Sequence, residues 1–183
     1  LCAAPGGKSF TLAEMMKSSG KVLSCDISEH RLKLIKDGAD RLGLTNIETM
    51  LNDGSIYNAS IPKADKILCD VPCSGLGVIR KKPEIRYKKS DEVDKLGDLQ
   101  YAILCVSSNY LKIGGELVYS TCSLNPDENE KIIEKFLSEH NDFESVKVLP
   151  ELKRYNGETD YVTLMPHIHG CDGFFISKIK RIR

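Results

Sequence analysis

The stretch from Lys21 to Leu51, KVLSCDISEHRLKLIKDGADRLGLTNIETML, indicates the fold most directly. It begins with a short apolar run that ends at Asp26 and continues with apolar residues at helical spacing over Glu29 to Leu42. A second apolar run follows at Ile47 to Leu51. A strand, a helix and a strand in this order are typical of parallel sheets, because parallel strands need a crossover connection. The stretch therefore predicts a βαβ unit.

The alternation of strands and helices continues on both sides of this unit. Helical spacing precedes it over Ser9 to Lys17, and a later helix, which we expect Ser90 to cap, carries an apolar stripe from Leu96 to Tyr110. Asn125, followed by Pro and, three residues after the cap, by Glu128, opens a further helix. Strands are expected at 66–70, at 116–122 after a turn at 114–115, at 143–148 and at 173–179. The pattern predicts an α/β fold with a doubly wound, mostly parallel sheet and helices on both faces.

Composition limits the classes of protein to which the chain can belong. Its 183 residues, 41% of them hydrophobic, suit one domain with its own core over 1–183. Lys plus Arg equals Asp plus Glu at 26 each, so any binding of nucleic acid must depend on a local patch. The seven cysteines are an odd number, and neither a signal peptide nor a membrane-spanning run is present. These features favour reduced thiols in a cytoplasmic protein, with no membrane partner.

The first residues, LCAAPGGK (1–8), are typical of a loop that follows a strand, yet no strand precedes them. In doubly wound sheets the strand before the first ligand loop is central to the sheet. We therefore expect the missing first strand upstream of Leu1, so that the domain is truncated on its N-terminal side.

The same loop predicts a ligand site. Gly6-Gly7 allows close approach of the backbone to a ligand, and the following helix offers its N-terminal amides. A phosphate-binding Walker A loop needs Gly where this chain has Cys2, and the dinucleotide fingerprint is absent, which leaves a methionine-derived cofactor. Asp26, at the end of the next strand, is placed to accept bonds from two ribose hydroxyls, and Asp53 to reach an adenine amino group. Each feature alone is also typical of an ordinary turn.

Two further loops carry thiols at predicted strand ends. Asp70-Val-Pro-Cys73-Ser-Gly75 follows one strand, and Cys122 lies where another gives way to a helix cap. A nearby helix N-terminus favours the nucleophilic thiolate, and an acid such as Asp70 can support a ring nitrogen of a base during attack. For the strand and helix cysteines, Cys25, Cys69 and Cys105, we expect burial as small apolar residues.

A basic stretch follows the first thiol loop. Residues 80–89, RKKPEIRYKK, hold six cations against Glu84, which predicts a phosphate track with Tyr87 available for stacking on a base. The predicted RNA-binding cations are Arg80, Lys81, Lys82, Arg86, Lys88 and Lys89. The cluster HIHGC (167–171) lacks the spacing of a zinc site, so no metal is expected.

The motifs CAAPGGK (2–8), DVPCSGLG (70–77), RKKP (80–83) and STCS (120–123) resemble, in this order and with these gaps, the Sun-family RNA cytosine-5 methyltransferases. The closing GCDGFF (170–175) is similar to the bacterial RsmB group of that family, which modifies small-subunit ribosomal RNA. The resemblance covers nearly the whole chain. It implies a Rossmann-like methyltransferase fold, RNA-binding domains upstream, and methylation of cytosine carbon 5 in RNA, with 16S rRNA as the expected substrate.

The resemblance also implies a role for each site residue. S-adenosylmethionine would be bound by Cys2, Ala3, Ala4, Pro5, Gly6, Gly7, Lys8, Asp26, Asp53 and Asp70. Cys122 would be the nucleophile that forms a covalent adduct with cytosine, Cys73 would act as base in product release, and Asp70 would contact the cytosine ring. We expect a monomer.

Two alternatives stay open. In DNA cytosine-5 methyltransferases the Pro-Cys thiol is the nucleophile, a role that would fall here to Cys73. The chain could also be a catalytically inactive RNA-binding or ribosome-assembly factor on the same fold, although the intact glycine loop and both thiols favour the enzyme.

Overall fold

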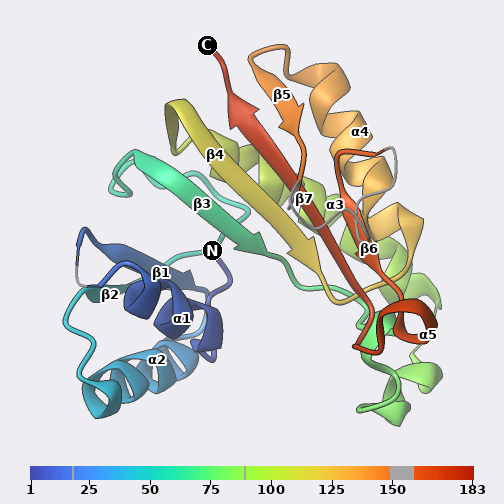
Figure 1. Ribbon diagram of the computed structural model, residues 1–183, viewed down its shortest axis with the longest axis horizontal. Helices are drawn as coiled ribbons and strands as arrows, with labels where there is room; N and C mark the ends of the chain where they lie inside the picture. Colours follow the sequence, from blue (N-terminus) through green and yellow to red (C-terminus); the bar gives the residue numbers. More distant parts are fainter. Residues whose placement is uncertain (18, 89, 149–158) are drawn as a thin grey trace. The chain divides into compact units, whose positions relative to one another are not determined.

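The computed structural model describes residues 1–17, 19–88, 90–148 and 159–183, with the backbone alone for 90–94. The chain forms two compact units, Leu1–Asn58 and Ala59–Arg183 (Figure 1). Each is described by itself below. Within the described residues, no helix combines the length and the apolar character that crossing a membrane requires.

The first unit contains the βαβ arrangement predicted from residues 21–51. Its elements are α1 (Gly7–Met15), β1 (Val22–Asp26), α2 (Glu29–Leu42) and β2 (Ile47–Leu51). The two strands are parallel, with Val22 level with Ile47 and Asp26 level with Leu51. The carboxyl ends of both strands therefore lie at the same edge of this small sheet.

Helix α2 forms at the predicted bounds because its ends and its inner face are well specified. The Ser28 side chain accepts a hydrogen bond from the backbone N–H of Arg31, which caps the first turn. Leu32 and Ile35 are buried against Ala4, and Ala3, Phe10 and Ile47 pack against this cluster. The core of this unit thus joins the glycine loop directly to α2.

The second unit is a five-stranded mixed sheet. Its strands are β3 (Ala64–Asp70), β4 (Leu111–Thr121), β5 (Phe143–Val146), β6 (Val162–Leu164) and β7 (Phe174–Arg181). The order is β3-β4-β7-β5, and β6 also pairs with β7. Strands β3 and β4 are parallel, whereas β7 runs antiparallel to β4, β5 and β6.

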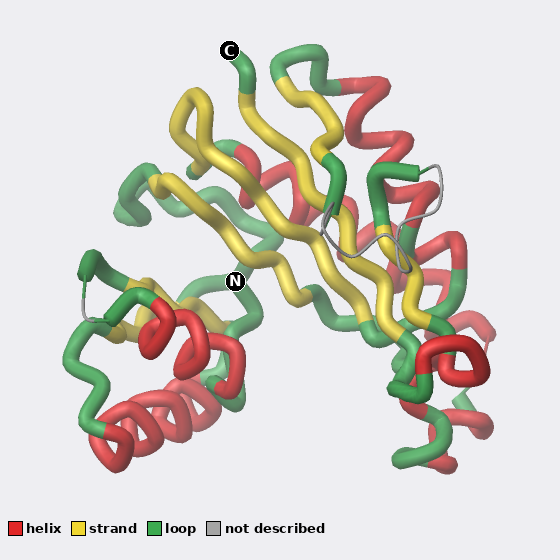
Figure 2. The backbone as a smooth tube through the Cα atoms, viewed as in Figure 1, coloured by secondary structure: helices red, strands yellow, loops and turns green. Residues whose placement is uncertain are grey.

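Helices α3 (Ser90–Ser108) and α4 (Glu130–Glu139) pack against each other and against this sheet, behind the strands in the view of Figure 2. The short elements are η1 (Leu76–Val78), η2 (Pro83–Tyr87), η3 (Pro126–Glu128) and α5 (Pro166–His169). Phe136 of α4 is fully buried and meets Phe143 edge-on, with ring centroids 5.2 Å apart. The predicted cap at Ser90 lies outside the described side chains.

Strand β4 begins earlier than the sequence predicts. The expected turn at Gly114-Gly115 lies inside the strand, where the register with β3 shifts between the pairs Ala64–Leu111 and Lys66–Glu116. Gly114 has a φ of 79° at this register shift, so the expected glycine turn falls within the bounds of β4.

The assigned burial of side chains on β4 can be tested by substituting one buried and one exposed residue of the strand. Leu117 is 0% exposed and Ile113 on the same strand is 71% exposed. We expect Leu117→Ala to lower the free energy of unfolding by about 2–5 kcal/mol, since it leaves a cavity in the core. The control Ile113→Ala should lower it by less than about 1 kcal/mol. Urea unfolding followed by far-UV circular dichroism measures both, and equal losses would contradict the assigned register.

Candidate active site

The two thiol loops of the second unit lie at one edge of its sheet. Strands β3 and β4 are parallel neighbours, and Asp70 at the end of β3 is level with Ser120. The chain then leaves β3 toward Cys73 and leaves β4 toward Cys122, so both thiols follow the carboxyl ends of adjacent strands. Their Sγ atoms are 3.1 Å apart. The structure thus brings together the two thiols that the sequence places at strand ends.

The contact between the sulfurs affects the protonation of Cys73. The hydrogen bond to Cys122 raises the pKa of the Cys73 thiol, and burial raises it further. Cys73 therefore keeps its proton at neutral pH. Either sulfur can be the donor in the 3.1 Å contact, and a bond donated by Cys73 would favour negative charge on Cys122.

Asp70 is held at the same strand end. Its Oδ1 accepts a hydrogen bond from the Ser120 hydroxyl at 3.0 Å, across the β3–β4 pair. The side chain is half-buried. The carboxyl group is therefore oriented by the neighbouring strand rather than by its own loop.

Backbone hydrogen bonds join the two thiol loops to the GCDGFF stretch (170–175). The N–H of Gly77 donates to the carbonyl of Cys122 at 2.9 Å, and the N–H of Gly173 donates to the carbonyl of Gly77 at 2.8 Å. A Cβ added at Gly77 would lie 2.2 Å from the Gly173 carbonyl oxygen. Only glycine permits this approach of three chain segments beside the thiols.

Three further cysteines were expected to be buried as small apolar residues. Cys25 and Cys69 are buried in strands, and burial raises the pKa of both, as expected for inert thiols. Cys105 in α3 is half-buried, so it is less buried than expected.

The glycine loop of the first unit is tied to the end of β1. Gly6 has φ of 112°, a left-handed conformation that favours glycine, and α1 begins at Gly7. The N–H of Ala3 donates to the carbonyl of Cys25 at 2.9 Å, and the N–H of Ala4 donates to Asp26 Oδ2 at 3.1 Å. The loop therefore places the first amides of α1 beside the carboxyl end of β1.

Asp26 is buried and makes hydrogen bonds within the protein that the sequence does not predict. It is 2% exposed, and its Oδ1 accepts bonds from the N–H of Ser28 at 3.2 Å and from Arg31 at 3.3 Å. Arg31 also donates to the carbonyl of Ala4 at 2.8 Å. In this arrangement Asp26 and Arg31 fasten the glycine loop, and a bond from Asp26 to a ribose stays a prediction.

Asp53 follows β2 at the same edge as Asp26. Its Oδ1 accepts bonds from the hydroxyl and the N–H of Ser55, at 2.6 and 2.9 Å. These bonds lower the pKa of Asp53 below its usual value, so the group is negatively charged at neutral pH. The first unit thus brings together the predicted loop, Asp26 and Asp53.

The basic stretch is partly engaged within the protein. Arg80 and Lys81 approach Asp172 at 3.6 and 2.6 Å, and Lys88 Nζ donates to the carbonyl of Ser74 at 2.8 Å. Lys82 and Arg86 are exposed, and Tyr87 is 85% exposed. The prediction for Lys89 lies outside the described residues. Lys88 therefore contacts the loop that carries Cys73. Its place in a run of positive charges does not predict this contact.

The HIHGC cluster makes local contacts. The N–H of Met165 donates to His169 Nδ1 at 2.7 Å, next to the short helix α5. Among the residues that the structure describes, no group of three or more His, Cys, Asp or Glu side chains is arranged to hold a metal ion.

Comparison with known proteins adds to this geometry. A sequence model of the family described as 16S rRNA methyltransferase RsmB/F matches residues 1–180. The chain is similar to the probable ribosomal RNA small subunit methyltransferase B of Bacillus subtilis, with 44% identity over 98% of this chain and 42% of that protein. It is 34% identical to the 28S rRNA (cytosine-C(5))-methyltransferase of Mus musculus, over 99% of this chain and 25% of that protein.

A solved structure is similar over the whole chain. It is the crystal structure of NSun6 from Pyrococcus horikoshii with SFG, with a TM-score of 0.88 and 28% identity, covering 100% of this chain and 47% of that one. The chain therefore spans less than half the length of each of these relatives.

The glycine contact beside the thiols is testable by substitution. Gly77→Ala should lower the free energy of unfolding by about 1–3 kcal/mol, because the added carbon meets backbone that cannot move aside easily. The control is Gly97→Ala in α3, where the nearest atom to an added Cβ lies 3.5 Å away. That change should raise the free energy of unfolding by about 0.5–1 kcal/mol. Thermal melts of both variants measure this, and an unaffected Gly77→Ala protein would refute the close approach.

Proposed function

Because the chain belongs to the 16S rRNA methyltransferase RsmB/F family, we propose that the protein transfers a methyl group from S-adenosylmethionine to carbon 5 of a cytosine in 16S rRNA. The observation that carries the proposal is the 3.1 Å contact between the sulfurs of Cys73 and Cys122 at the ends of parallel strands. The cytosine-C(5) activity named for the mouse relative supports the position of methylation. Reduced thiols suit the cytoplasm, where we place the reaction.

The chemistry needs a sulfur nucleophile because carbon 5 of cytosine is itself a poor one. The Cys122 thiolate adds to carbon 6, and the electron pair of the C5–C6 bond becomes available at carbon 5. Carbon 5 then attacks the methyl group, whose bond to the sulfonium sulfur breaks to leave S-adenosylhomocysteine. Asp70 interacts with the ring nitrogen that becomes more basic on addition. The target base must first leave its stack to reach the thiols.

The second half of the reaction needs a base, and Cys73 is suited to that role. The pKa of its thiol is raised mainly by the hydrogen bond with Cys122. Once the Cys122 sulfur is bonded to carbon 6, it no longer carries negative charge, so this cause of the raised pKa is removed. Cys73 can then lose its proton to water and accept the proton of carbon 5. The C5–C6 double bond forms again, and Cys122 leaves as thiolate.

S-adenosylmethionine supplies the methyl group, and the first unit has the features of a binding site for it. A Cβ added at Gly7 would meet nothing within 4 Å, so space lies beside the loop. The N-terminal amides of α1, the backbone of residues 2–8 and the charged Asp53 supply donors and an acceptor at one edge. SFG in the NSun6 structure, an analogue of S-adenosylmethionine, supports this cofactor.

RNA would approach along the basic stretch. Lys82 and Arg86 are exposed for phosphate contacts, and Tyr87 offers a free ring face for a base. Asp172 holds Arg80 and Lys81 in place. Lys88 belongs structurally to the thiol loop, so we expect it to affect that loop more than RNA affinity.

The roles of the two thiols predict opposite phenotypes. With the full-length protein, 16S rRNA and tritiated S-adenosylmethionine, Cys122→Ala should abolish both methyl transfer and the covalent adduct on a denaturing gel. Cys73→Ala should accumulate the adduct, because the nucleophile cannot leave. Cys105→Ala, in α3 of the same unit, is the control and should behave as wild type. The reverse pattern would assign Cys73 as nucleophile, and tight RNA binding without transfer by the wild type would favour an assembly factor.

The cofactor site is tested separately from the chemistry. Asp53→Ala removes a charged acceptor and should weaken binding of S-adenosylmethionine about tenfold or more. Asp40→Ala, an exposed acid on α2 in the same unit, is the control and should leave the affinity unchanged. Isothermal titration calorimetry on the full-length protein measures both dissociation constants, and equal values would remove Asp53 from the site.

A further inference from the structure

A buried acid lies behind the two thiol loops and has no part in the reaction proposed above. Glu128, the last residue of η3, is 1% exposed. Its carboxyl group accepts four hydrogen bonds, which come from the Ser74 N–H at 2.7 Å, the Ser74 hydroxyl at 2.5 Å, the Ser123 hydroxyl at 2.5 Å and the Gln100 amide at 2.9 Å. Burial of a carboxyl group is unfavourable unless such bonds replace its water.

The groups that Glu128 holds are the direct neighbours of the thiols. Ser74 follows Cys73 in the chain, and Ser123 follows Cys122. The two serine hydroxyls are 2.9 Å apart and share the same carboxyl oxygen, Oε2. One side chain thus links both loops immediately beside the 3.1 Å sulfur contact.

The linkage is itself anchored to the core of the unit. Gln100 of α3, which donates to Glu128, also donates to the carbonyl of Pro72 at 2.9 Å. The hydroxyl of Tyr119, a fully buried residue of β4, donates to the backbone carbonyl of Glu128 at 2.7 Å. Movement of either thiol loop would therefore break bonds to a helix and a strand of the core.

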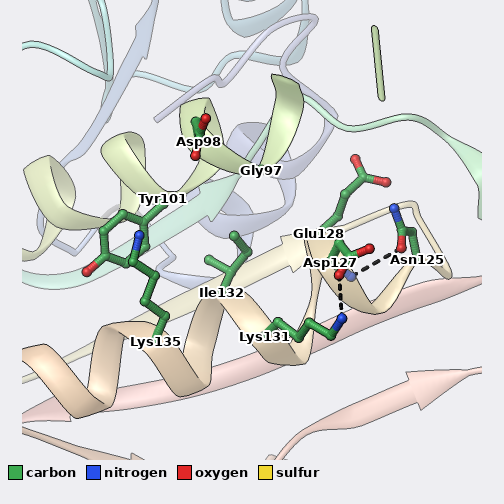
Figure 3. A pocket seen from close by; sticks show the side chains of 9 residues that line it. All are labelled: Gly97, Asp98, Tyr101, Asn125, Asp127, Glu128, Lys131, Ile132 and Lys135. Carbon is green, nitrogen blue, oxygen red and sulfur yellow. Dashed lines mark hydrogen bonds and ion pairs between the residues drawn. The ribbon is translucent and has the colours of Figure 1, made fainter. Parts of the chain in front are cut away.

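Glu128, three residues after the cap Asn125, was expected to complete the cap by bonding to the N–H of Asn125, and this bond is not formed. Asn125 accepts from the N–H of Asp127 at 3.1 Å, but the N–H of Asn125 donates to the Ser123 hydroxyl instead of to Glu128. Figure 3 shows Asp127 meeting Lys131 in the groove between α3 and α4, while the Glu128 carboxyl group turns away from that pair. The acid therefore belongs to the thiol loops rather than to the helix start.

We infer that Glu128 is a positioning residue that sets the distance between the Cys73 and Cys122 sulfurs, an inference that rests on the proposed function for its catalytic meaning. A carboxyl group suits the task because the N–H of Ser74 and the NH₂ group of Gln100 that faces it can only donate. Both carboxyl oxygens accept, so the side chain satisfies two loops and a helix together. Loss of this bridge should let the loops separate and leave the Cys73 thiol without its partner.

The direct test measures the sulfurs without using activity. The full-length protein is equilibrated in glutathione redox buffers, and the fraction of Cys73–Cys122 disulfide is mapped by peptide mass spectrometry. Glu128→Ala should lower the equilibrium constant for this disulfide about tenfold or more, since the loops lose their shared acceptor. Asp127→Asn, the exposed neighbour on the same element, is the matched control and should leave the constant unchanged.

The Glu128→Gln variant tests whether the loops are linked by the hydrogen bonds of this side chain or by its negative charge. Its oxygen can serve Ser74 N–H and Gln100, and its NH₂ can donate to the two hydroxyls if they turn to accept. We expect this variant to restore the disulfide constant to within about threefold of wild type. An unchanged constant in Glu128→Ala, or a Glu128→Gln protein as impaired as Glu128→Ala, would overturn the positioning role. If Glu128→Ala does not fold, Ser123→Ala replaces it, and an unchanged constant in that variant overturns the inference equally.

Kinetics separate this inference from the proposed function. With methyl transfer as the readout, Glu128→Ala should lower kcat about tenfold or more while KM for S-adenosylmethionine stays unchanged. An equal loss in both parameters would contradict positioning at the thiols. If the wild-type protein transfers no methyl group, the proposed function fails, but the disulfide equilibrium still decides whether Glu128 sets the sulfur distance.

Discussion

The parallel pairing of β3 with β4 is the constraint on which the candidate active site depends. It places Asp70 level with Ser120, so that the chain leaves both strands at one edge of the sheet. A shift of one residue would turn the strand-end side chains to the opposite face, since neighbours along a strand alternate. The register is secured by buried residues such as Leu117 and Tyr119, so the core of the unit and the position of its thiols are specified together.

Strand pairing alone brings the two loops near each other, but it does not set a sulfur contact. Two further sets of contacts bring the sulfurs together. Gly77 joins the first thiol loop to the Cys122 carbonyl and to Gly173, and Glu128 joins the serines that follow each cysteine. Both sets of contacts act on the backbone or on residues adjacent to the thiols rather than on the thiol groups themselves. The contact between the two sulfurs also raises the pKa of the Cys73 thiol.

Much of this arrangement is predictable from sequence, and the parts that are not share a physical reason. Apolar periodicity predicts α2 and β2 at their observed bounds and the βαβ unit between Val22 and Leu51, because helix caps and burial act locally. Periodicity carries no direction, so the antiparallel course of β7 and the short β6 were not predicted. The two thiols were recognisable from their motifs. Glu128 was misassigned to a helix cap, because the partners that decide its role lie 28 and 54 residues away.

The central claim is that the Cys122 sulfur bonds to the target cytosine while Cys73 serves the second half of the reaction. It is tested most directly by trapping the adduct on the wild-type protein. A 16S rRNA that carries 5-fluorocytidine cannot lose a proton from carbon 5, so the adduct should persist after methyl transfer. Mass spectrometry of the digested complex should find the nucleotide on the peptide that contains Cys122. A nucleotide on the Cys73 peptide, or methyl transfer with no adduct on either cysteine, would contradict the account.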